Sequence, residues 1–572
     1  MKEMELYSLW TKTELEDTDL SEEPAAIAGD TEAIKDRFYR DLEFGTGGLR
    51  GVLGAGTNRM NIYTVRKATQ GLADYLNEAT EHPSVAISYD SRIKSDKFAA
   101  EAARVLAANG IKAYLYDHLM PTPCLSFAVR ELHCDAGIMV TASHNPAKYN
   151  GYKVYGPDGC QLTLEAADRV LSLINKIDIF GGVRLTSFEE ALKDGGIEYI
   201  KPEVEEKFLE NVKAQSLDPD ACEKAGLKVV YTPLNGTGNL PVRKILAMRG
   251  IQDVFVVKEQ EMPDGTFKTC PFPNPEIPEA LALGLKLCEE KKPDLLLATD
   301  PDCDRVGIAV PDENGSYVLL TGNEVGALLM EYICKQRTAS GTMPKDPVAV
   351  KTIVTTELAA KVAADYGVTM IDVLTGFKFI GEQILYLEQK GEKDRFLFGF
   401  EESYGYLAGT YARDKDAVVA SMLICEMAAH YKLEGVSLLT ALNNLYAKYG
   451  FYIHRQQSFT CEGEAGMEQM KAIMASLRTD TPKEIAGQAV VSFSDYLASE
   501  TVELATGAKT EIKLPKSDVL SFVLANGNSI VLRPSGTEPK IKAYYTAISD
   551  SKDGALAAIE EMKASFTKVL GF

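Results

Sequence analysis

The chain has too little positive charge for a protein whose main partner is nucleic acid or an anionic membrane. Its 61 lysines and arginines are outnumbered by 82 aspartates and glutamates, which gives a formal net charge of -21. Because both partners are bound by basic surfaces, we expect neither of them here. A net charge of this sign also repels phosphate esters, so a site for such substrates must collect arginine and lysine locally.

Disulfide motifs, a signal peptide and a membrane-spanning run are also missing. The ten cysteines lie between Cys124 and Cys461 with no CxxC pair and no regular spacing, which is typical of reduced, buried thiols in the cytosol. Residues 1–19 are acidic and lack the apolar stretch of a signal peptide. The longest apolar run, around residues 417–425, is far too short to cross a bilayer. We therefore expect a cytoplasmic protein.

No low-complexity tract or long linker marks the domain boundaries, so they are predicted from the pattern of apolar residues. At 572 residues the chain exceeds what one hydrophobic core usually serves. Short β-branched runs first alternate with helical periods at residues 85–89, 98–109, 111–116, 125–132 and 136–140. This order is typical of βαβ units, in which helices cover parallel strands.

The same alternation begins again twice, and then the pattern changes. Further strands are predicted at residues 227–231, 254–257, 295–298, 348–353, 370–374 and 396–400. From about Tyr452 onward, strand-like runs precede a closing helix at residues 554–569. We predict three similar α/β domains in tandem and a C-terminal α+β domain, with the boundaries 1–203, 204–320, 321–450 and 451–572.

Polar loops follow a strand in each of the three predicted α/β domains, where open α/β sheets bind their ligands. The first loop, residues 141–146 (TASHNP), presents Ser143 directly after a strand. A polar turn with a helix-capping serine is the alternative interpretation of these six residues. The GxSxG motif of hydrolases is absent, so an esterase is poorly supported.

The second loop, residues 299–305 (TDPDCDR), contains three alternating aspartates, Asp300, Asp302 and Asp304. In an extended loop, alternating side chains point the same way. Three converging carboxylates would repel one another without a cation, and Mg²⁺ accepts a few carboxylates together with phosphate oxygens. An EF-hand is a weak alternative because its glycine and distal glutamate are missing, and a solvated acidic turn is the other alternative.

The third loop, residues 399–405 (GFEESYG), spaces Glu401 and Ser403 to face one side, which suits them to hold two hydroxyls of a sugar. An acidic turn at the start of a helix would have the same composition, so this loop alone is unspecific.

A fourth loop lies in the predicted C-terminal domain at residues 533–540 (RPSGTEPK). It joins the guanidinium of Arg533 to side-chain and backbone donors of Ser535, Gly536 and Thr537. Such a turn can bind phosphate oxygens, although surface turns of this composition are also common.

Together and in this order, the four loops resemble those of the α-D-phosphohexomutase superfamily. The similarity is close to the bacterial phosphoglucomutase branch that is allied to phosphopentomutases, and it extends from residues 44–51 (FGTGGLRG) to the fourth loop. It implies four domains around a deep central cleft, the first three with one α/β topology. One small departure is Gly47, where many relatives have serine.

The resemblance also implies roles for individual residues. Ser143 would carry the phosphoryl group with His144 beside it, Lys153 would transfer protons, and Arg305 would steady the transferring group. One Mg²⁺ per chain would be bound by the phosphorylated Ser143 and by Asp300, Asp302 and Asp304. The implied substrate contacts are Arg50, Thr375, Gly376, Glu401, Ser403, Lys415, Arg533, Ser535, Gly536 and Thr537.

The implied reaction is the reversible interconversion of glucose 1-phosphate and glucose 6-phosphate, with glucose 1,6-bisphosphate as activator and intermediate. The partners would be small sugar phosphates, and the protein would be a monomer or a weak homodimer. Phosphopentomutase, phosphomannomutase and glucose-bisphosphate synthase remain open as related activities. A metal-dependent phosphatase would give no reason for a remote anchor at Arg533, and a non-enzymatic paralogue would be expected to have lost Ser143, an aspartate or Arg305.

Overall fold

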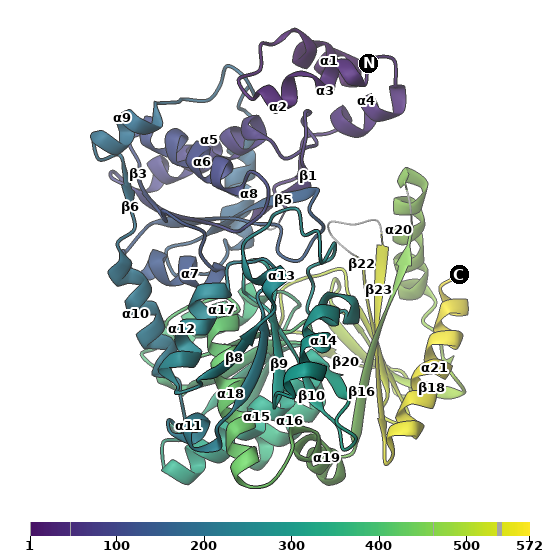
Figure 1. Ribbon diagram of the computed structural model, residues 1–572. Helices are drawn as coiled ribbons and strands as arrows, with labels where there is room; N and C mark the ends of the chain where they lie inside the picture. The colour runs from purple at the N-terminus through teal and green to yellow at the C-terminus, as the bar shows by residue number, and fades with distance from the viewer. Residues whose placement is uncertain (1, 46, 462, 535–539) are drawn as a thin grey trace. The chain divides into compact units, whose positions relative to one another are not determined.

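A computed structural model describes residues 2–45, 47–461, 463–534 and 540–572 of the chain (Figure 1). The chain divides into two compact units. The first comprises Met1–Gly322, Ile380–Gly399 and Ser403–Gly435, and the second comprises Asn323–Phe379, Phe400–Glu402 and Val436–Phe572.

Four short helices begin the first unit: α1 (Lys2–Lys12), α2 (Thr18–Ser21), α3 (Glu23–Ala26) and α4 (Thr31–Phe38). The indole of Trp10 is buried, and its ring meets the rings of Phe38, Tyr63 and Phe180 edge to face at 5.2–6.1 Å. Such aromatic contacts attach this acidic segment to the sheet domain that follows. Its helices were not predicted, because the segment was interpreted only as lacking a signal peptide.

The first sheet has the strand order β1-β5-β4-β2-β3-β6. Strands β2, β3 and β4 are parallel as predicted, and β6, which was not predicted, is parallel to β3; β5 runs antiparallel to β4, and β1 antiparallel to β5. The sheet is therefore mixed at one edge. Its elements are β1 (Gly48–Val52), α5 (Ile62–Ala79), β2 (Ser84–Tyr89), α6 (Ser95–Ala108), β3 (Lys112–Leu115), α7 (Thr122–Glu131), β4 (Ala136–Val140), β5 (Tyr149–Tyr155), α8 (Leu164–Ile174), α9 (Phe188–Lys193) and β6 (Ile197–Tyr199).

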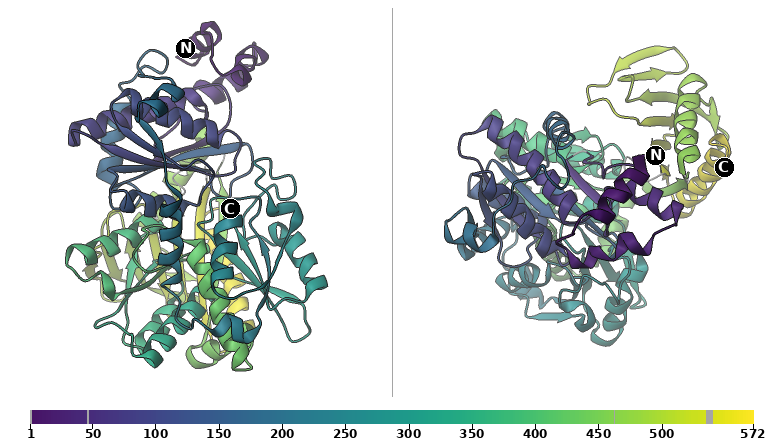
Figure 2. Two further views of the ribbon diagram at one scale, coloured as in Figure 1. Left: turned by 60° about the vertical axis from the view of Figure 1, so that its left-hand side comes forward. Right: turned by 90° about the horizontal axis from the view of Figure 1, so that it is seen from above.

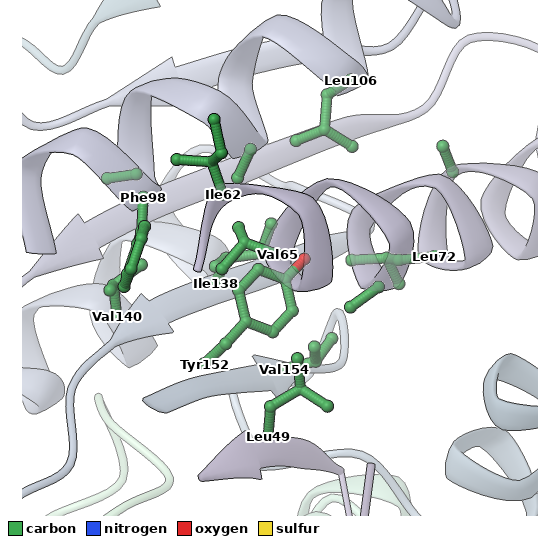
Figure 3. Close-up of a cluster of buried hydrophobic side chains, with 14 of the residues drawn as sticks. Leu49, Ile62, Val65, Leu72, Phe98, Leu106, Ile138, Val140, Tyr152 and Val154 are labelled. Atoms are coloured by element: carbon green, nitrogen blue, oxygen red, sulfur yellow. The ribbon is translucent and has the colours of Figure 1, made fainter. Parts of the chain in front are cut away.

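The core of this domain lies between the sheet and helices α5, α6 and α8, which cover one face while α7 lies on the other (Figure 1). Val65 and Leu72 of α5 and Phe98 of α6 point toward Ile138 and Tyr152 of the strands (Figure 3). All five are at most 1% exposed, so the sheet that ends in the Ser143 loop is rigidly supported.

The second sheet, with the order β11-β10-β9-β7-β8, is also mixed: β7 is parallel to β8 and β9, and β10 is antiparallel to β9 and β11. The elements here are α10 (Pro202–Lys213), α11 (Ala221–Ala225), β7 (Lys228–Thr232), α12 (Asn239–Met248), β8 (Asp253–Val256), α13 (Lys258–Glu261), η1 (Pro278–Leu281), α14 (Ala282–Lys291), β9 (Leu295–Thr299), β10 (Val306–Pro311) and β11 (Tyr317–Leu320). Later parts of the first unit are η2 (Lys393–Arg395), β15 (Gly405–Ala408) and α18 (Ala417–Leu433).

Helix α18 contains the apolar run noted in the sequence and packs against β9 and β10. Among the described residues, no helix combines the length and apolarity that a bilayer crossing requires.

The second unit begins with α/β elements and ends in a larger antiparallel sheet. The α/β elements are α15 (Gly322–Ser340), the parallel pair β12 (Val348–Thr352) and β13 (Thr369–Val373), α16 (Glu357–Asp365) and α19 (Leu438–Tyr449). Helix α17 (Phe377–Gln389) and strand β14 (Phe396–Glu401) each contain residues of both units.

The C-terminal sheet has the order β16-β23-β22-β21-β18-β19-β20, with β17 paired to β18. Helices α20 and α21 cover one face of it (Figure 2), where Met474 and Phe566 join the apolar side chains of the strands. This is an α+β arrangement, as the sequence predicts. Its elements are β16 (Phe451–Thr460), α20 (Gly463–Thr479), β17 (Glu484–Ile485), β18 (Gln488–Asp495), β19 (Glu500–Glu503), β20 (Ala508–Glu511), β21 (Leu520–Leu524), β22 (Ser529–Pro534), β23 (Lys540–Ser549) and α21 (Lys552–Val569).

Candidate active site

Ser143 lies on the loop that follows β4, in the first unit. Its hydroxyl donates a hydrogen bond to Asp300 Oδ2 at 2.8 Å, and the Nδ1 atom of His144 lies 3.2 Å from the same oxygen. The side chain of Asp300 comes from the loop after β9 of the second sheet. The structure thus brings together two loops that are 157 residues apart in the sequence.

The side chains of the three aspartates after β9 converge, but the backbone conformation that brings them together differs from the predicted one. The loop is a turn rather than an extended segment: the Cys303 N–H donates to the Asp300 carbonyl at 2.9 Å, and Cys303 adopts a left-handed conformation with φ 52°. One carboxylate oxygen from each of Asp300, Asp302 and Asp304 lies within 4.8 Å of the others, and all three side chains are buried. The argument from strand-like alternation was wrong, although its conclusion about convergence was correct.

The aspartate cluster has the chemistry of a site for a hard cation. The Oδ1 atoms of Asp302 and Asp304 are buried and have no hydrogen-bond partner among the described residues. Leaving a buried carboxylate oxygen without a donor is costly, and such atoms in native proteins call for an explanation. A divalent ion that prefers oxygen ligands would satisfy both atoms, so the three aspartates could hold a metal ion.

Two lysines offset part of the negative charge. Lys153 Nζ, from β5, lies 3.0 Å from Asp302 Oδ2 and 3.7 Å from Asp304 Oδ2. Lys415 Nζ lies 3.2 Å from Asp304 Oδ2 and 3.0 Å from Asp414 Oδ1. This is the local collection of positive charge that the acidic composition requires.

The pKa values of the aspartates diverge because their neighbours differ. Burial, together with the charges of Asp302 and Asp304, raises the pKa of Asp300 well above its usual value. Burial also disfavours the charged form of Asp302, but the ammonium of Lys153, the hydrogen bond with Asp300 and the charge of Lys415 together outweigh burial and hold that pKa below its usual range. Asp302 is therefore the carboxylate most firmly kept ionised.

The two basic groups nearest Ser143 are shifted in opposite directions. Burial, and then the positive charges of Arg305 and Arg50, lower the pKa of His144 well below its usual value, so its imidazole is neutral. Burial also acts to lower the pKa of Lys153, but the carboxylates around it, Asp302 first, raise it instead. Lys153 is therefore charged.

Arg305 lies in the loop before β10, and Arg50 lies in β1. The Nη1 atom of Arg305 donates to Glu276 Oε1 at 3.1 Å and to the Ser403 carbonyl at 2.6 Å. Arg50 is an exposed residue of β1, where it pairs with Gly151, two residues before Lys153 on β5. The antiparallel edge of the first sheet therefore places Arg50 and Lys153 on neighbouring strands.

Other predicted substrate contacts belong to the second unit. The Gly376 N–H donates to Glu401 Oε1 at 2.9 Å, so the two predicted sugar-contacting loops meet there, next to the half-buried Thr375. Arg533 lies near the end of β22, opposite Lys542 of β23. Its predicted neighbours Ser535, Gly536 and Thr537 lie outside the described residues.

The models of the four domains of one protein family match the chain in order along the sequence. They are phosphoglucomutase/phosphomannomutase α/β/α domain I at residues 41–179, domain II at 206–315, domain III at 321–449 and the C-terminal domain at 464–562. The phosphoglucomutase of Staphylococcus saprophyticus is 39% identical over 509 residues, which cover 89% of this chain and 91% of that protein. The phosphoglucomutase of Staphylococcus aureus (strain bovine RF122) is 38% identical over 531 residues, which cover 92% and 93%.

The chain belongs to the phosphoglucomutase/phosphomannomutase family.

Solved structures of distant relatives share the fold. A phosphomannomutase assigned as putative, from Thermus thermophilus, superposes with a TM-score of 0.70 at 22% identity and covers 93% of this chain and 100% of its own. The open form of a Paramecium phosphoglucomutase, the phosphoprotein parafusin, gives a TM-score of 0.68 at 18% identity, with 93% and 96% covered. The α/β domains and the C-terminal α+β domain are thus those of the phosphoglucomutase/phosphomannomutase family, and the chain is an enzyme of this family.

In this family member, sequence reasoning missed several residues that support the predicted ones. Thr122, at the start of α7, binds Asp302 twice: its N–H donates to the Asp302 carbonyl at 2.9 Å and its hydroxyl to Oδ2 at 3.0 Å. Asp414 accepts a hydrogen bond from the Tyr155 hydroxyl at 2.8 Å while it contacts Lys415. Nothing in the local sequence distinguishes Thr122, whereas Asp414 adjoins a residue that had been singled out.

Proposed function

We propose that the chain interconverts glucose 1-phosphate and glucose 6-phosphate, with glucose 1,6-bisphosphate as the intermediate and activator. The observation on which this depends is the contact between Ser143 Oγ and Asp300 in a buried group of three aspartates. The phosphoglucomutases of staphylococci, at 38–39% identity over about nine tenths of the chain, support glucose as the sugar.

Ser143 is the proposed carrier of the phosphoryl group. Transfer breaks the bond between phosphorus and Ser143 Oγ and forms one between phosphorus and a sugar oxygen, while the proton of the sugar hydroxyl ends on Ser143 Oγ. Asp300, Asp302, Asp304 and the phosphorylated serine would hold one Mg²⁺, which supplies charge neutralisation for phosphoryl transfer when it is bound. The three buried aspartates and the two orphaned Oδ1 atoms support this ligand set.

The remaining residues position groups and move the proton. Lys153 is charged, so we assign it the role of proton donor. It gives a proton to Ser143 Oγ as this oxygen leaves phosphorus, and it then takes the proton of the sugar hydroxyl. His144 adds no charge and contacts the same oxygen through a ring nitrogen. Arg305 would steady the transferring group with its guanidinium.

The sugar has to be accepted in two orientations, because the bisphosphate turns around between the two transfers. The proposed contacts to the sugar and to its non-reacting phosphate are Arg50, Thr375, Gly376, Glu401, Ser403, Lys415, Arg533, Ser535, Gly536 and Thr537. The hydrogen bond between Gly376 and Glu401 supports a shared role for two of these loops. We also propose the domain limits 1–203, 204–320, 321–450 and 451–572 and a cytoplasmic location, which the ten free, buried cysteines support.

A second candidate is phosphomannomutase, which the family description names. Turnover of glucose 1-phosphate, mannose 1-phosphate and ribose 1-phosphate, each with a catalytic amount of the matching bisphosphate, separates the candidates. A higher kcat/KM on glucose 1-phosphate supports the proposal. A higher kcat/KM on mannose 1-phosphate or ribose 1-phosphate would instead indicate a phosphomannomutase or a phosphopentomutase. Rapid release of inorganic phosphate without isomerisation would indicate a phosphatase.

The Ser143→Ala variant tests the carrier role. We expect turnover to be lost, because the substitution removes the proposed acceptor oxygen next to Asp300. The thermal unfolding midpoint should change little. The matched control is Ser126→Ala, a buried serine whose hydroxyl donates to the Gly159 carbonyl at 2.7 Å and accepts from the Arg413 N–H. That variant should lose stability and still become phosphorylated. Near-normal mutase turnover in Ser143→Ala would refute the proposed mechanism.

A further inference from the structure

Arg92, in the loop after β2, has a completely buried side chain that binds the backbone of the Ser143 loop. Its Nη1 atom donates to the carbonyls of Pro146 and Tyr149, each at 3.1 Å, and its Nη2 atom donates to the carbonyls of Ser143 and Asn145. One planar guanidinium therefore holds four carbonyls of one loop. The fork geometry of arginine suits this task, and the ammonium of lysine does not.

Asp90 completes a ring of contacts around Ser143. Its Oδ2 atom lies 3.3 Å from Arg92 Nε and accepts a hydrogen bond from the Thr141 hydroxyl at 2.6 Å. The same Thr141 oxygen accepts from the Ser143 N–H at 2.8 Å. The Oδ1 atom of Asp90 accepts from the Ser95 hydroxyl at 2.8 Å, so both carboxylate oxygens of Asp90 accept hydrogen bonds.

The backbone of Ser143 requires such support. It has φ 52°, a left-handed conformation that residues other than glycine seldom adopt. Strained conformations of this kind persist only where the surroundings fix them from several directions. Here the N–H of Ser143 is held through Thr141 and Asp90, and its carbonyl is held by Arg92 directly.

A loop of the second α/β domain also packs against Arg92. Gly265 pairs with Arg92, and the fully buried ring of Phe267 lies 5.1 Å from the guanidinium carbon. A Cβ atom at Gly265 would lie 2.5 Å from the backbone nitrogen of Ile93, so only glycine permits this approach. Arg92 thus binds the Ser143 loop and also contacts the domain that supplies Asp300.

We propose that Arg92 is a positioning residue for phosphoryl transfer: it holds Ser143 in the left-handed conformation that directs Oγ at Asp300. This role rests on the proposed function, because it presumes that Ser143 is the carrier. Arg92 does not touch the substrate in this proposal and acts through the loop alone.

Replacement of Arg92 by lysine tests the proposal. In Arg92→Lys we expect kcat to fall about 100-fold, because a displacement of about 1 Å at a reacting group costs roughly this much. KM should change little, since the sugar contacts are unaltered. The matched control is Arg249→Lys: Arg249 is also buried and donates to a backbone carbonyl, that of Pro219. It should lose stability but keep its kcat, and a normal kcat in Arg92→Lys would overturn the proposal.

Amide hydrogen exchange gives a reading that does not depend on turnover. In Arg92→Lys, the backbone N–H groups of residues 143–145 and 147–149 should exchange faster than in wild type, whereas Arg249→Lys should leave them unchanged. Equal protection of this loop in both variants would overturn the positioning role. If the wild-type protein turns over no sugar phosphate, the proposed function fails, and the exchange result then decides only whether Arg92 holds the Ser143 loop.

Gly265→Ala provides a second variant if Arg92→Lys does not fold. The added methyl group must displace the loop that packs on Arg92, so kcat should fall while KM again changes little. Gly181→Ala is its control, because a Cβ atom there would meet only Asp178 Oδ1, at 3.4 Å. Unchanged kcat in Gly265→Ala, with normal exchange of residues 143–149, would also overturn the proposal.

Discussion

At the scale of single residues, Asp416 shows that a buried carboxyl can be held by several donors and still resist ionisation. Its Oδ1 atom accepts from the N–H groups of Val418 and Val419 at 2.7 and 3.1 Å and caps α18, while the Tyr411 hydroxyl donates to Oδ2 at 2.6 Å. Burial nevertheless raises the pKa of Asp416 to about 6. The free energy lost by removing the carboxylate charge from water exceeds the stabilisation that these hydrogen bonds provide.

The raised pKa of Asp416 makes stability depend on pH. A carboxyl with a higher pKa in the folded state stabilises it fully below the unfolded pKa of 3.8, and this contribution is lost as pH rises through about 6. The neutral variant Asp416→Asn keeps the cap and avoids the loss. Relative to wild type, it should therefore gain about 3 kcal/mol of unfolding free energy between pH 4 and pH 7. Thermal unfolding of both proteins across this range measures the gain, and a constant difference would contradict the prediction.

Residue spacing predicted the three aspartates, but it did not reveal every residue that supports the site. Asp300, Asp302 and Asp304 stand out because their alternation is visible in seven letters of sequence. Arg92 lies in a polar cluster after a strand, YDSR, and the rule that singled out the other strand ends would have found it too. Thr122 could not be found, since its contact with Asp302 depends on a helix N-terminus from another domain.

At the scale of elements, helix α5 begins with a capping box that also fixes the preceding loop. Asn61 Oδ1 accepts from the N–H groups of Tyr63 and Thr64, each at 3.0 Å, and the Thr64 hydroxyl accepts from the Asn61 N–H. The Nδ2 atom of Asn61 donates to the carbonyls of Gly54 and Gly56 at 2.9 and 3.0 Å. One side chain therefore serves both the helix and the loop that continues from β1.

Asn61→Ala should destabilise the protein by about 2 kcal/mol, the upper end of the usual loss on removing a cap, because buried carbonyls also lose their donors. Ser551 of α21 provides the comparison: its hydroxyl accepts only from the Gly554 N–H, at an exposed site. Ser551→Ala should therefore cost about 1 kcal/mol or less. Denaturant unfolding compares the two, and an equal loss in both would show that the contacts to Gly54 and Gly56 contribute little.

Interior strands were easier to predict than edge strands and terminal helices. The run AGIMV became β4 with the expected bounds, Ala136–Val140, because a fully buried strand is continuously apolar. Strand β5, YNGYKVY, contains Lys153 and Gly151 among its seven residues and has no such signature. Its antiparallel direction, and that of β1, follows from pairing between distant segments, which local sequence does not encode.

At the scale of the whole molecule, an acidic protein has gathered positive charge where its proposed site lies. The net charge is -21, yet Lys153 and Lys415 both contact the aspartate cluster, and Arg305 and Arg50 act on the pKa of His144. The lysines reduce the repulsion among the aspartates, so the fold should persist without a divalent ion. A bound ion should nevertheless add stability, because it binds only where the three carboxylates are assembled.

Mg²⁺ should therefore raise the thermal unfolding midpoint. At a concentration 100 times its Kd, a ligand specific for the folded state adds about 2.7 kcal/mol. Asp302→Asn should lose most of this stabilisation, because it removes a proposed ligand and a charge. Asp264→Asn, at a half-buried aspartate outside the cluster, should retain it. The ligand assignment would be wrong if Mg²⁺ raised the midpoints of wild type and Asp302→Asn equally.

The interior strands and the residue types at four loops follow from the sequence alone, because periodicity and composition are local properties of the chain. Which loops meet follows from the tertiary structure: the hydrogen bond between Ser143 and Asp300, the two lysines on the carboxylates and the guanidinium of Arg92 on the loop of a left-handed serine. Those contacts join segments that are far apart in the sequence, and their geometry depends on strand direction, turn conformation and burial, none of which is a property of any single segment.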